Sequence, residues 1–241
     1  MSVNNHEQPC RTPAGRIWEL DFFRGIALLL MIYFHFIFDM NEMFNYPVSY
    51  TSGINYYIGK ISAILFIFIS GISSSLSRSN IKRGLRVLAI ALVITVATHL
   101  YGAEFGIKFG ILHFLGICML LYPLIRPVNN YLLVIICTMA IILGYYAQKV
   151  VVPYNYLFPF GLTSISFTSS DYYPLFPWSG LFIYGVVFGK VFYSSKKSLL
   201  PFNPNNNVVV RAVSFLGRNT LLIYLIHQPV TIAILTLINY L

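Results

Sequence analysis

The chain has 241 residues, of which 57% are hydrophobic and only 10% are charged, and its formal net charge at pH 7 is +9. Soluble domains are about 25% charged, so the composition excludes an ordinary soluble fold, which would expose large apolar patches. Nucleic-acid binding is excluded as the meaning of the positive charge, because the basic residues stand in short clusters beside long apolar segments.

Residues 1–15 are polar and form a predicted N-terminal tail, followed by one transmembrane domain over residues 16–241. Seven apolar segments in that domain are long enough to cross about 30 Å of hydrocarbon. In chain order they are residues 19–40, 54–76, 84–101, 110–125, 131–151, 175–193 and 216–240. The first is too long for the core of a signal peptide, so we expect it to be retained. The sequence therefore predicts an all-α, polytopic membrane helix bundle of about seven transmembrane helices.

The loop charges predict the orientation of this bundle. With the N-terminus inside, the cytoplasmic side holds Arg11, Arg16, Arg24, Arg78, Lys82, Arg83, Arg86, Arg126, Lys190, Lys196, Lys197, Arg211 and Arg218, and the outer side holds Lys60, Lys108 and Lys149. Positive residues concentrate on the cytoplasmic side of membrane proteins. The distribution therefore predicts an N-in, C-out, multi-pass protein of the cell membrane with an odd number of helices.

Two long loops interrupt the pattern. The outer loop 152–174 contains prolines, aromatic residues and a Ser/Thr-rich stretch. Such a loop either dips back to cap a cavity or lies at the membrane interface. The inner loop 194–210 is rich in proline and asparagine and is predicted to be a flexible tether.

A histidine and a carboxylate share one side of the first helix near its outer end. His35 and Asp39 are spaced i, i+4, so they lie one turn apart. A carboxylate in this place would orient the imidazole and raise its basicity, as in an acid–base pair. The simpler alternative is a capping Asp39 and an interfacial His35.

Other polar residues collect at the same outer level. His113 begins the fourth helix, Glu104 lies in the glycine-rich turn before it, and Asp171 and Trp178 flank the start of the sixth helix. Placing an ionisable side chain within the membrane costs free energy, so such residues are candidates for a functional role. Their convergence predicts a site at this end, although a lone histidine or tryptophan would more often anchor the surface. The three cysteines are odd in number and lack metal-ligand spacing, so no disulfide framework and no metal site is predicted.

The inner end carries arginines. Arg83 and Arg86 begin the third helix, Arg218 begins the seventh, and Arg24 stands one turn from Asp21 on the first. In one interpretation these arginines only hold the inner helix ends at the cytoplasmic membrane surface. Asp21 and Arg24 would then form a structural ion pair. In the other, arginines at helix ends bind the phosphates of a cofactor.

Two features of the later helices have mainly structural interpretations. Gly185 and Gly189 form a small-xxx-small pattern typical of helix packing. His227 precedes Gln228 and Pro229 in the middle of the last helix, where the proline frees a backbone carbonyl. A packing hydrogen bond is the simpler role for His227, and a direct role in chemistry is the alternative.

Four stretches carry a family resemblance. They are Arg16-Ile-Trp-Glu-Leu-Asp21-Phe-Phe-Arg24-Gly25 with Met31-Ile-Tyr-Phe-His35-Phe-Ile-Phe-Asp39, Gly110-Ile-Leu-His113-Phe-Leu-Gly116, Asp171-Tyr-Tyr-Pro174-Leu-Phe-Pro177-Trp178, and Gly217-Arg218-Asn-Thr-Leu-Leu-Ile-Tyr-Leu-Ile-His227-Gln-Pro229. Their order and spacing over about residues 16–230 resemble the catalytic domain of the heparan-α-glucosaminide N-acetyltransferase family, and its small bacterial members above all.

The resemblance implies transfer of an acetyl group from cytosolic acetyl-CoA to a sugar-like hydroxyl or amine on the outer side. The family pattern places a catalytic histidine in the first outer loop, and loop 41–53 departs from it by containing no histidine. His35, oriented by Asp39, would then be the base, and His113 would polarise the carbonyl or share the base role. Arg24, Arg83, Arg86 and Arg218 would bind the nucleotide. Asp171, Trp178 and Glu104 would contact the acceptor.

The partners implied are a small-molecule acceptor, a glycan or glycolipid, and the lipid bilayer, with no nucleic acid and with a homo-oligomer as an open alternative. A transporter or flippase of a small polar or lipid-linked solute is the rival function, although no internal repeat is visible. A retinal-type light sensor is excluded for the last helix, since residues 216–240 contain no lysine.

Overall fold

The computed structural model describes residues 16–200 and 207–240. The predicted tail over residues 1–15 and the middle of the predicted tether 194–210 lie outside these ranges. The described residues form eight α-helices, and their only β-structure is two isolated bridges. The helices are α1 (Trp18–Glu42), α2 (Gly53–Leu76), α3 (Asn80–Tyr101), α4 (Ile111–Ile125), α5 (Asn130–Ala147), α6 (Leu175–Phe192), α7 (Val208–Arg218) and α8 (Thr220–Tyr240).

The prediction of an all-α membrane bundle is confirmed. Six helices, α1, α2, α3, α5, α6 and α8, are long and apolar enough to cross a bilayer. The fourth predicted span is α4, which has only 15 residues and is therefore about 22 Å long. The first half of α4 is buried among the other helices, whereas Leu121 and Leu124 near its C-terminal end are exposed.

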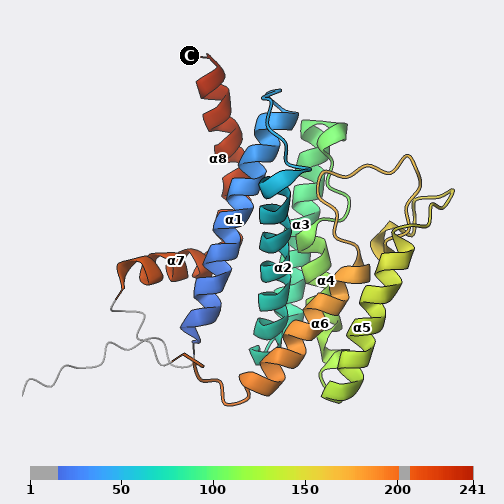
Figure 1. The fold of residues 1–241 in the computed structure, drawn as a ribbon, viewed down its shortest axis with the longest axis vertical. Helices are drawn as coiled ribbons and strands as arrows, with labels where there is room; N and C mark the ends of the chain where they lie inside the picture. The colour runs from blue at the N-terminus through green and yellow to red at the C-terminus, as the bar shows by residue number, and fades with distance from the viewer. Residues whose placement is uncertain (1–15, 201–206, 241) are drawn as a thin grey trace, which may run out of the picture.

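The helices form a bundle with α2 near its centre (Figure 1). Helix α2 packs against α1 on one side and α6 on the other, α5 covers the far side of α6, and α3 pairs with α4. Helix α8 runs beside α1, and its C-terminal part extends beyond the other helices. Phe114, Ile67, Phe182 and Val186 are fully buried where α2, α4 and α6 meet.

Glycines let α2 and α6 approach closely. A side chain at Gly185 would collide with the carbonyl of Phe68, and one at Gly71 would collide with the carbonyl of Phe182. A side chain at Gly189 would likewise collide with the side chain of Ser75. The small-xxx-small pattern of α6 therefore has the packing role predicted for it.

Helix α7 was not predicted. The sequence suggested a tether to residue 210 and a span from residue 216, but the chain instead forms an amphipathic helix that runs across α1 rather than along it (Figure 1). Asn207 caps its first turn by accepting hydrogen bonds from the amides of Val209 and Val210. Gly217, the residue before its last, lies so close to α1 that a side chain there would collide with the carbonyl of Asp21. Arg218 is therefore the last residue of α7 and does not open α8.

The outer loop folds back over the start of α4. The amide of Tyr173 donates to the carbonyl of Phe109 at 2.9 Å, and the amide of Val152 donates to the carbonyl of Thr163 at 3.1 Å. The hydroxyl of Tyr172 donates to the carbonyl of Phe158 at 2.6 Å. The loop therefore caps a cavity, as one of its two interpretations predicted, because it places three residues in the lining.

Candidate active site

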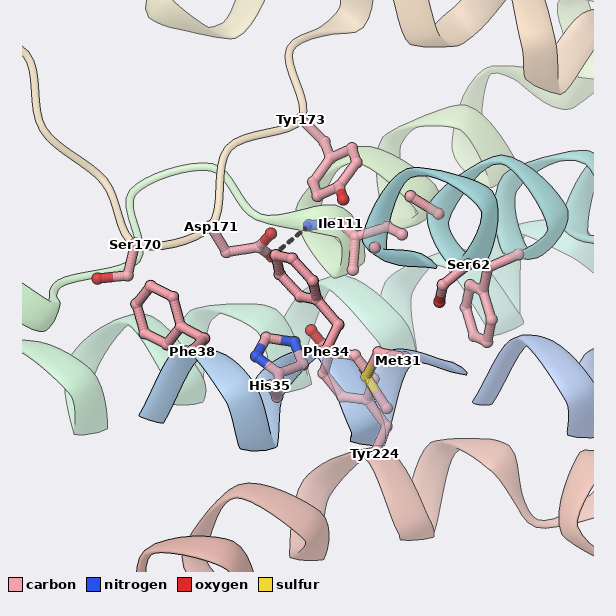
Figure 2. A pocket seen from close by; sticks show the side chains of 13 residues that line it. Met31, Phe34, His35, Phe38, Ser62, Ile111, Ser170, Asp171, Tyr173 and Tyr224 are labelled. Atoms are coloured by element: carbon pink, nitrogen blue, oxygen red, sulfur yellow. Dashed lines mark hydrogen bonds between the residues drawn. The ribbon is translucent and has the colours of Figure 1, made fainter. Parts of the chain in front are cut away.

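A small cavity lies near the outer end of the bundle, between α1, α2, α8, the start of α4 and the outer loop. Its volume is about 70 Å³, which is room for only a few water molecules. Its lining consists of Met31, Phe34, His35 and Phe38 from α1, Gly59, Ser62, Ala63 and Phe66 from α2, Ile111, Ser170, Asp171, Tyr173 and Tyr224. Figure 2 shows His35 and Asp171 on opposite sides of this space.

His35 reaches the cavity from the middle of the outer half of α1. Its ring packs edge-on against Phe34 at 5.9 Å and lies 5.1 Å from the ring of His227, measured between centroids. No hydrogen bond joins a His35 nitrogen to any other residue within 16–200 and 207–240. An imidazole with uncommitted nitrogens in a cavity can accept a proton from a bound molecule.

Asp171 comes to the same cavity from the outer loop. One carboxylate oxygen, Oδ2, accepts the backbone N–H of Ile111 at 2.9 Å, shown as a dashed line in Figure 2. It therefore caps the positive N-terminal end of α4. The approach is so close that a side chain at Gly110 would collide with the carboxylate. Burial raises the pKa of Asp171 to about 6, and the hydrogen bond from Ile111 opposes that rise.

The raised pKa of Asp171 predicts how stability depends on pH. The folded state binds the proton more tightly than the unfolded state, so the favourable contribution is complete below about pH 4 and is lost as pH rises through about 6. Relative to Asp171→Asn, the wild type should lose on the order of 1 kcal/mol between pH 4 and pH 7. Thermal unfolding of both proteins across this range measures it. A stability difference that does not change with pH would contradict the assignment.

Tyrosine and serine hydroxyls complete the polar lining, and the sequence did not single them out. Tyr173 lies on the loop two residues after Asp171, and Tyr224 reaches the cavity from α8. Ser62 donates to the carbonyl of Ala27 at 2.9 Å and so helps to fix α2 against α1. With 18 tyrosines in the chain, composition gives no signal for these two. The only sequence signal for Tyr173 and Tyr224 is that each lies inside one of the family motifs quoted above.

Among the described residues no hydrogen bond joins Asp39 to His35, so the predicted acid–base pair is not formed in this structure. The Asp39 carboxylate is fully buried and accepts hydrogen bonds from Gln228 Nε2 at 2.6 Å and Thr231 Oγ1 at 3.0 Å. Both donors belong to α8. The i, i+4 spacing does put His35 and Asp39 on one side of α1, but that side faces α8, and the neutral donors there bind the carboxylate.

His113 is bound in a local network at the start of α4. Its Nδ1 accepts the N–H of Gly110 at 3.3 Å. Its Nε2 lies 3.1 Å from Thr95 Oγ1, whose proton goes to the carbonyl of Ile107. The Nε2 proton is therefore donated to Thr95, and both ring nitrogens are occupied. His113 caps a helix and does not line the cavity.

The other two predicted acceptor contacts also lie outside the cavity lining. Glu104 belongs to a 3₁₀ turn over Ala103–Phe105 at the mouth of the α3–α4 connection, and its carbonyl accepts a 3.4 Å hydrogen bond from Ser170. Trp178 packs its ring against Tyr173 with centroids 5.0 Å apart. Trp178 therefore contacts Tyr173, which lines the cavity, without lining the cavity itself.

At the inner end, Arg24 ties three elements together. It donates to Asp21 at 2.9 Å, to Ser73 Oγ of α2 at 2.6 Å and to the carbonyl of Gly217 of α7 at 3.5 Å. Asp21 also forms an ion pair with Arg16, whose Nε lies 3.1 Å from Asp21 Oδ2. The ion pair between Asp21 and Arg24 is thus present, and most of the donor capacity of Arg24 is used inside the protein.

The remaining inner arginines are freer. Arg83 is half-buried in the first turn of α3, close enough to Arg24 for their charges to repel each other. Arg86 is exposed one turn further on. Arg218 is exposed on α7, where it lines an open groove with Arg211 and donates from Nε to the carbonyl of Ser214 at 3.3 Å. Arg83 is therefore the best placed of the four to bind an incoming phosphate beside a helix N-terminus.

Comparison with known families gives one finding. A family model described as heparan-alpha-glucosaminide N-acetyltransferase, catalytic, matches residues 16–229. The comparisons with curated proteins and with solved structures each give no match. The match runs from α1 to Pro229 of α8 and includes His35, Asp171 and the inner arginines.

Proposed function

The chain belongs to the heparan-α-glucosaminide N-acetyltransferase catalytic family, a family of transmembrane acetyltransferases, and we propose that it moves an acetyl group from cytosolic acetyl-CoA to an acceptor on the outer side of the cell membrane. The acceptor is a sugar-like hydroxyl or amine, carried by a glycan or glycolipid. The observation that carries the proposal is the uncommitted imidazole of His35 in a polar cavity at the outer end of the bundle.

In the proposed step His35 acts as the base. One unprotonated ring nitrogen takes the proton of the acceptor hydroxyl or amine while the acceptor oxygen or nitrogen attacks the thioester carbonyl. The carbon–sulfur bond breaks, and the thiolate of CoA leaves and takes up a proton. Direct transfer and transfer through an acetyl-histidine use the same nitrogen. The hydroxyls of Tyr173 and Tyr224 line the cavity and are the donors suited to the oxygen that becomes negative in the transition state.

The donor would reach His35 by extending along α1 from the inner end. Arg24 and His35 are eleven residues apart in the sequence, which is close to three helical turns and about 16 Å. They therefore share one side of the helix, with Leu28 and Met31 between them. Leu28 is fully buried and the cavity holds about 70 Å³, so the pantetheine arm requires the helices beside α1 to separate before the thioester reaches His35.

Binding of acetyl-CoA gives the first test. A ligand present at ten times its Kd and bound only by the folded state should stabilise the purified protein by about 1.4 kcal/mol. For a chain of this size that raises Tm by about 3 to 5 °C. Dephospho-CoA should give a smaller shift, because it lacks one of the phosphates that the inner arginines would bind.

Acetyl transfer gives the second test. Protein in lipid nanodiscs is incubated with radiolabelled acetyl-CoA and a panel of amino sugars, neutral sugars and glycolipids, and free thiol and labelled product are both measured. Release of thiol with matching product supports the proposal. Movement of solute across the bilayer without consumption of acetyl-CoA would instead support the rival transporter.

A further inference from the structure

Helices α1 and α8 meet through two polar contacts, one above the other. In the first, the ring of His35 lies 5.1 Å from the ring of His227, between centroids, at an angle of 56°. In the second, one turn further along α1, Asp39 accepts hydrogen bonds from Gln228 and Thr231. The buried carboxylate therefore fixes how α8 sits along α1, and it brings His227 next to His35.

The protonation of His227 follows from its neighbour. Its Nδ1 lies 2.7 Å from the carbonyl of Tyr224, and a carbonyl only accepts, so Nδ1 carries the proton. In the neutral ring Nε2 is then an acceptor. This atom is buried and has no hydrogen-bond partner in the part of the chain that the structure describes. A buried acceptor without a donor is costly, and each such atom in a native protein calls for an explanation.

We propose that His227 is the positioning residue of His35. When an acceptor molecule fills the cavity, one N–H of His35 is donated to Nε2 of His227, directly after a small rotation of the ring or through one water. That hydrogen bond leaves the other His35 nitrogen unprotonated and turned toward the acceptor. The proposal rests on the proposed function, and it gives His227 the orienting role that the sequence had suggested for Asp39.

The role of Asp39 in this arrangement is indirect. Its two hydrogen bonds are to the residue after His227 and to a residue one turn later on α8, on either side of Pro229. Proline removes one backbone hydrogen bond from the helix at this point. The side-chain contacts of Asp39 hold α8 in the region where Pro229 removes a backbone hydrogen bond. They therefore maintain the distance between the rings of His35 and His227.

A matched pair of variants tests the hydrogen bond. His227→Gln keeps an acceptor near the place of Nε2, whereas His227→Asn places its amide near Nδ1 and leaves the ε position empty. We expect His227→Asn to lower kcat about 10- to 100-fold with KM changed less than threefold, and His227→Gln to recover most of that loss. Equal losses in both variants, or no loss in His227→Asn, would overturn the proposal, because packing alone does not distinguish the two amides.

A second measurement does not depend on acetyl transfer. In protein labelled with ¹⁵N-histidine and held in lipid bilayers, nitrogen chemical shifts report which His35 nitrogen carries the proton, with assignment from a His35→Gln sample. With a hydroxyl-bearing probe such as glycerol in the cavity, the wild type should show one tautomer, His227→Gln the same one, and His227→Asn a mixture. An unchanged tautomer in His227→Asn overturns the positioning role. Absence of transfer by the wild type would refute the function separately.

Discussion

Replacing His35 with alanine should lower the rate of acetyl transfer by about 10²- to 10⁴-fold, the usual contribution of a general base. The expected cause is chemical, because the His35 ring makes no hydrogen bond within the described ranges and its loss leaves no buried donor or acceptor unpaired. The thermal stability of His35→Ala should therefore stay close to that of the wild type. Initial rates of thiol release with an acceptor, together with Tm, measure both expectations.

His113→Ala is the matched control for this experiment. It removes the acceptor of the Gly110 N–H and the donor to Thr95, so it should cost about 1 to 3 kcal/mol of stability. The folded fraction should keep its catalytic rate within about tenfold. If His35→Ala retains wild-type activity, the site assignment fails. If His113→Ala is stable and inactive, the base is His113 as the resemblance also allowed.

The fold was largely predictable because a bilayer restricts what a sequence can do. Seven apolar segments of membrane-spanning length predict a bundle of about seven helices, and the structure places a helix on each segment. What hydropathy could not reveal was α7. Arg211 interrupts its apolar residues and Arg218 ends it, so a search for long continuous apolar runs passes over this short amphipathic helix.

Two of the predicted site residues, His35 and Asp171, line one cavity, but the predicted contacts between side chains were only partly right. Depth along a helix follows from residue number, so His35 and Asp171 were correctly expected at the same end. Which side chains touch depends on how each helix is rotated and on how the outer loop folds back, and neither is visible in spacing. Asp39 shows the difference, since its position on α1 was right and its partners are on α8.

Replacing Arg24 with leucine should destabilise the protein by about 2 to 3 kcal/mol. Arg24 joins α1 to Ser73 on α2 and to the end of α7, and breaking a buried ion pair commonly costs about 3 to 5 kcal/mol. Asp21 keeps Arg16 as a partner, which places the expected cost below that range. Chemical or thermal unfolding of the purified variant in detergent measures it.

Arg83→Leu should behave in the opposite way. The Arg83 side chain makes no hydrogen bond or ion pair within residues 16–200 and 207–240, so its loss should change stability by less than about 1 kcal/mol. A charged hydrogen bond to phosphate contributes about 1.5 to 3 kcal/mol, so acetyl-CoA should bind at least tenfold more weakly. Titration of acetyl-CoA by calorimetry provides the readout, and Lys82→Leu, one residue earlier on the exposed side of α3, is the control.

Arg24 and Arg83 are expected to have different roles at the inner end, Arg24 in holding the helices together and Arg83 in binding the nucleotide. Arg24 has its donors directed to Asp21, Ser73 and Gly217, so a nucleotide would have to displace those contacts. Arg83 repels Arg24 across a short distance, and a phosphate placed between them would relieve that repulsion. A stable Arg24→Leu variant that no longer binds acetyl-CoA would show instead that Arg24 gives up its internal partners to hold the nucleotide.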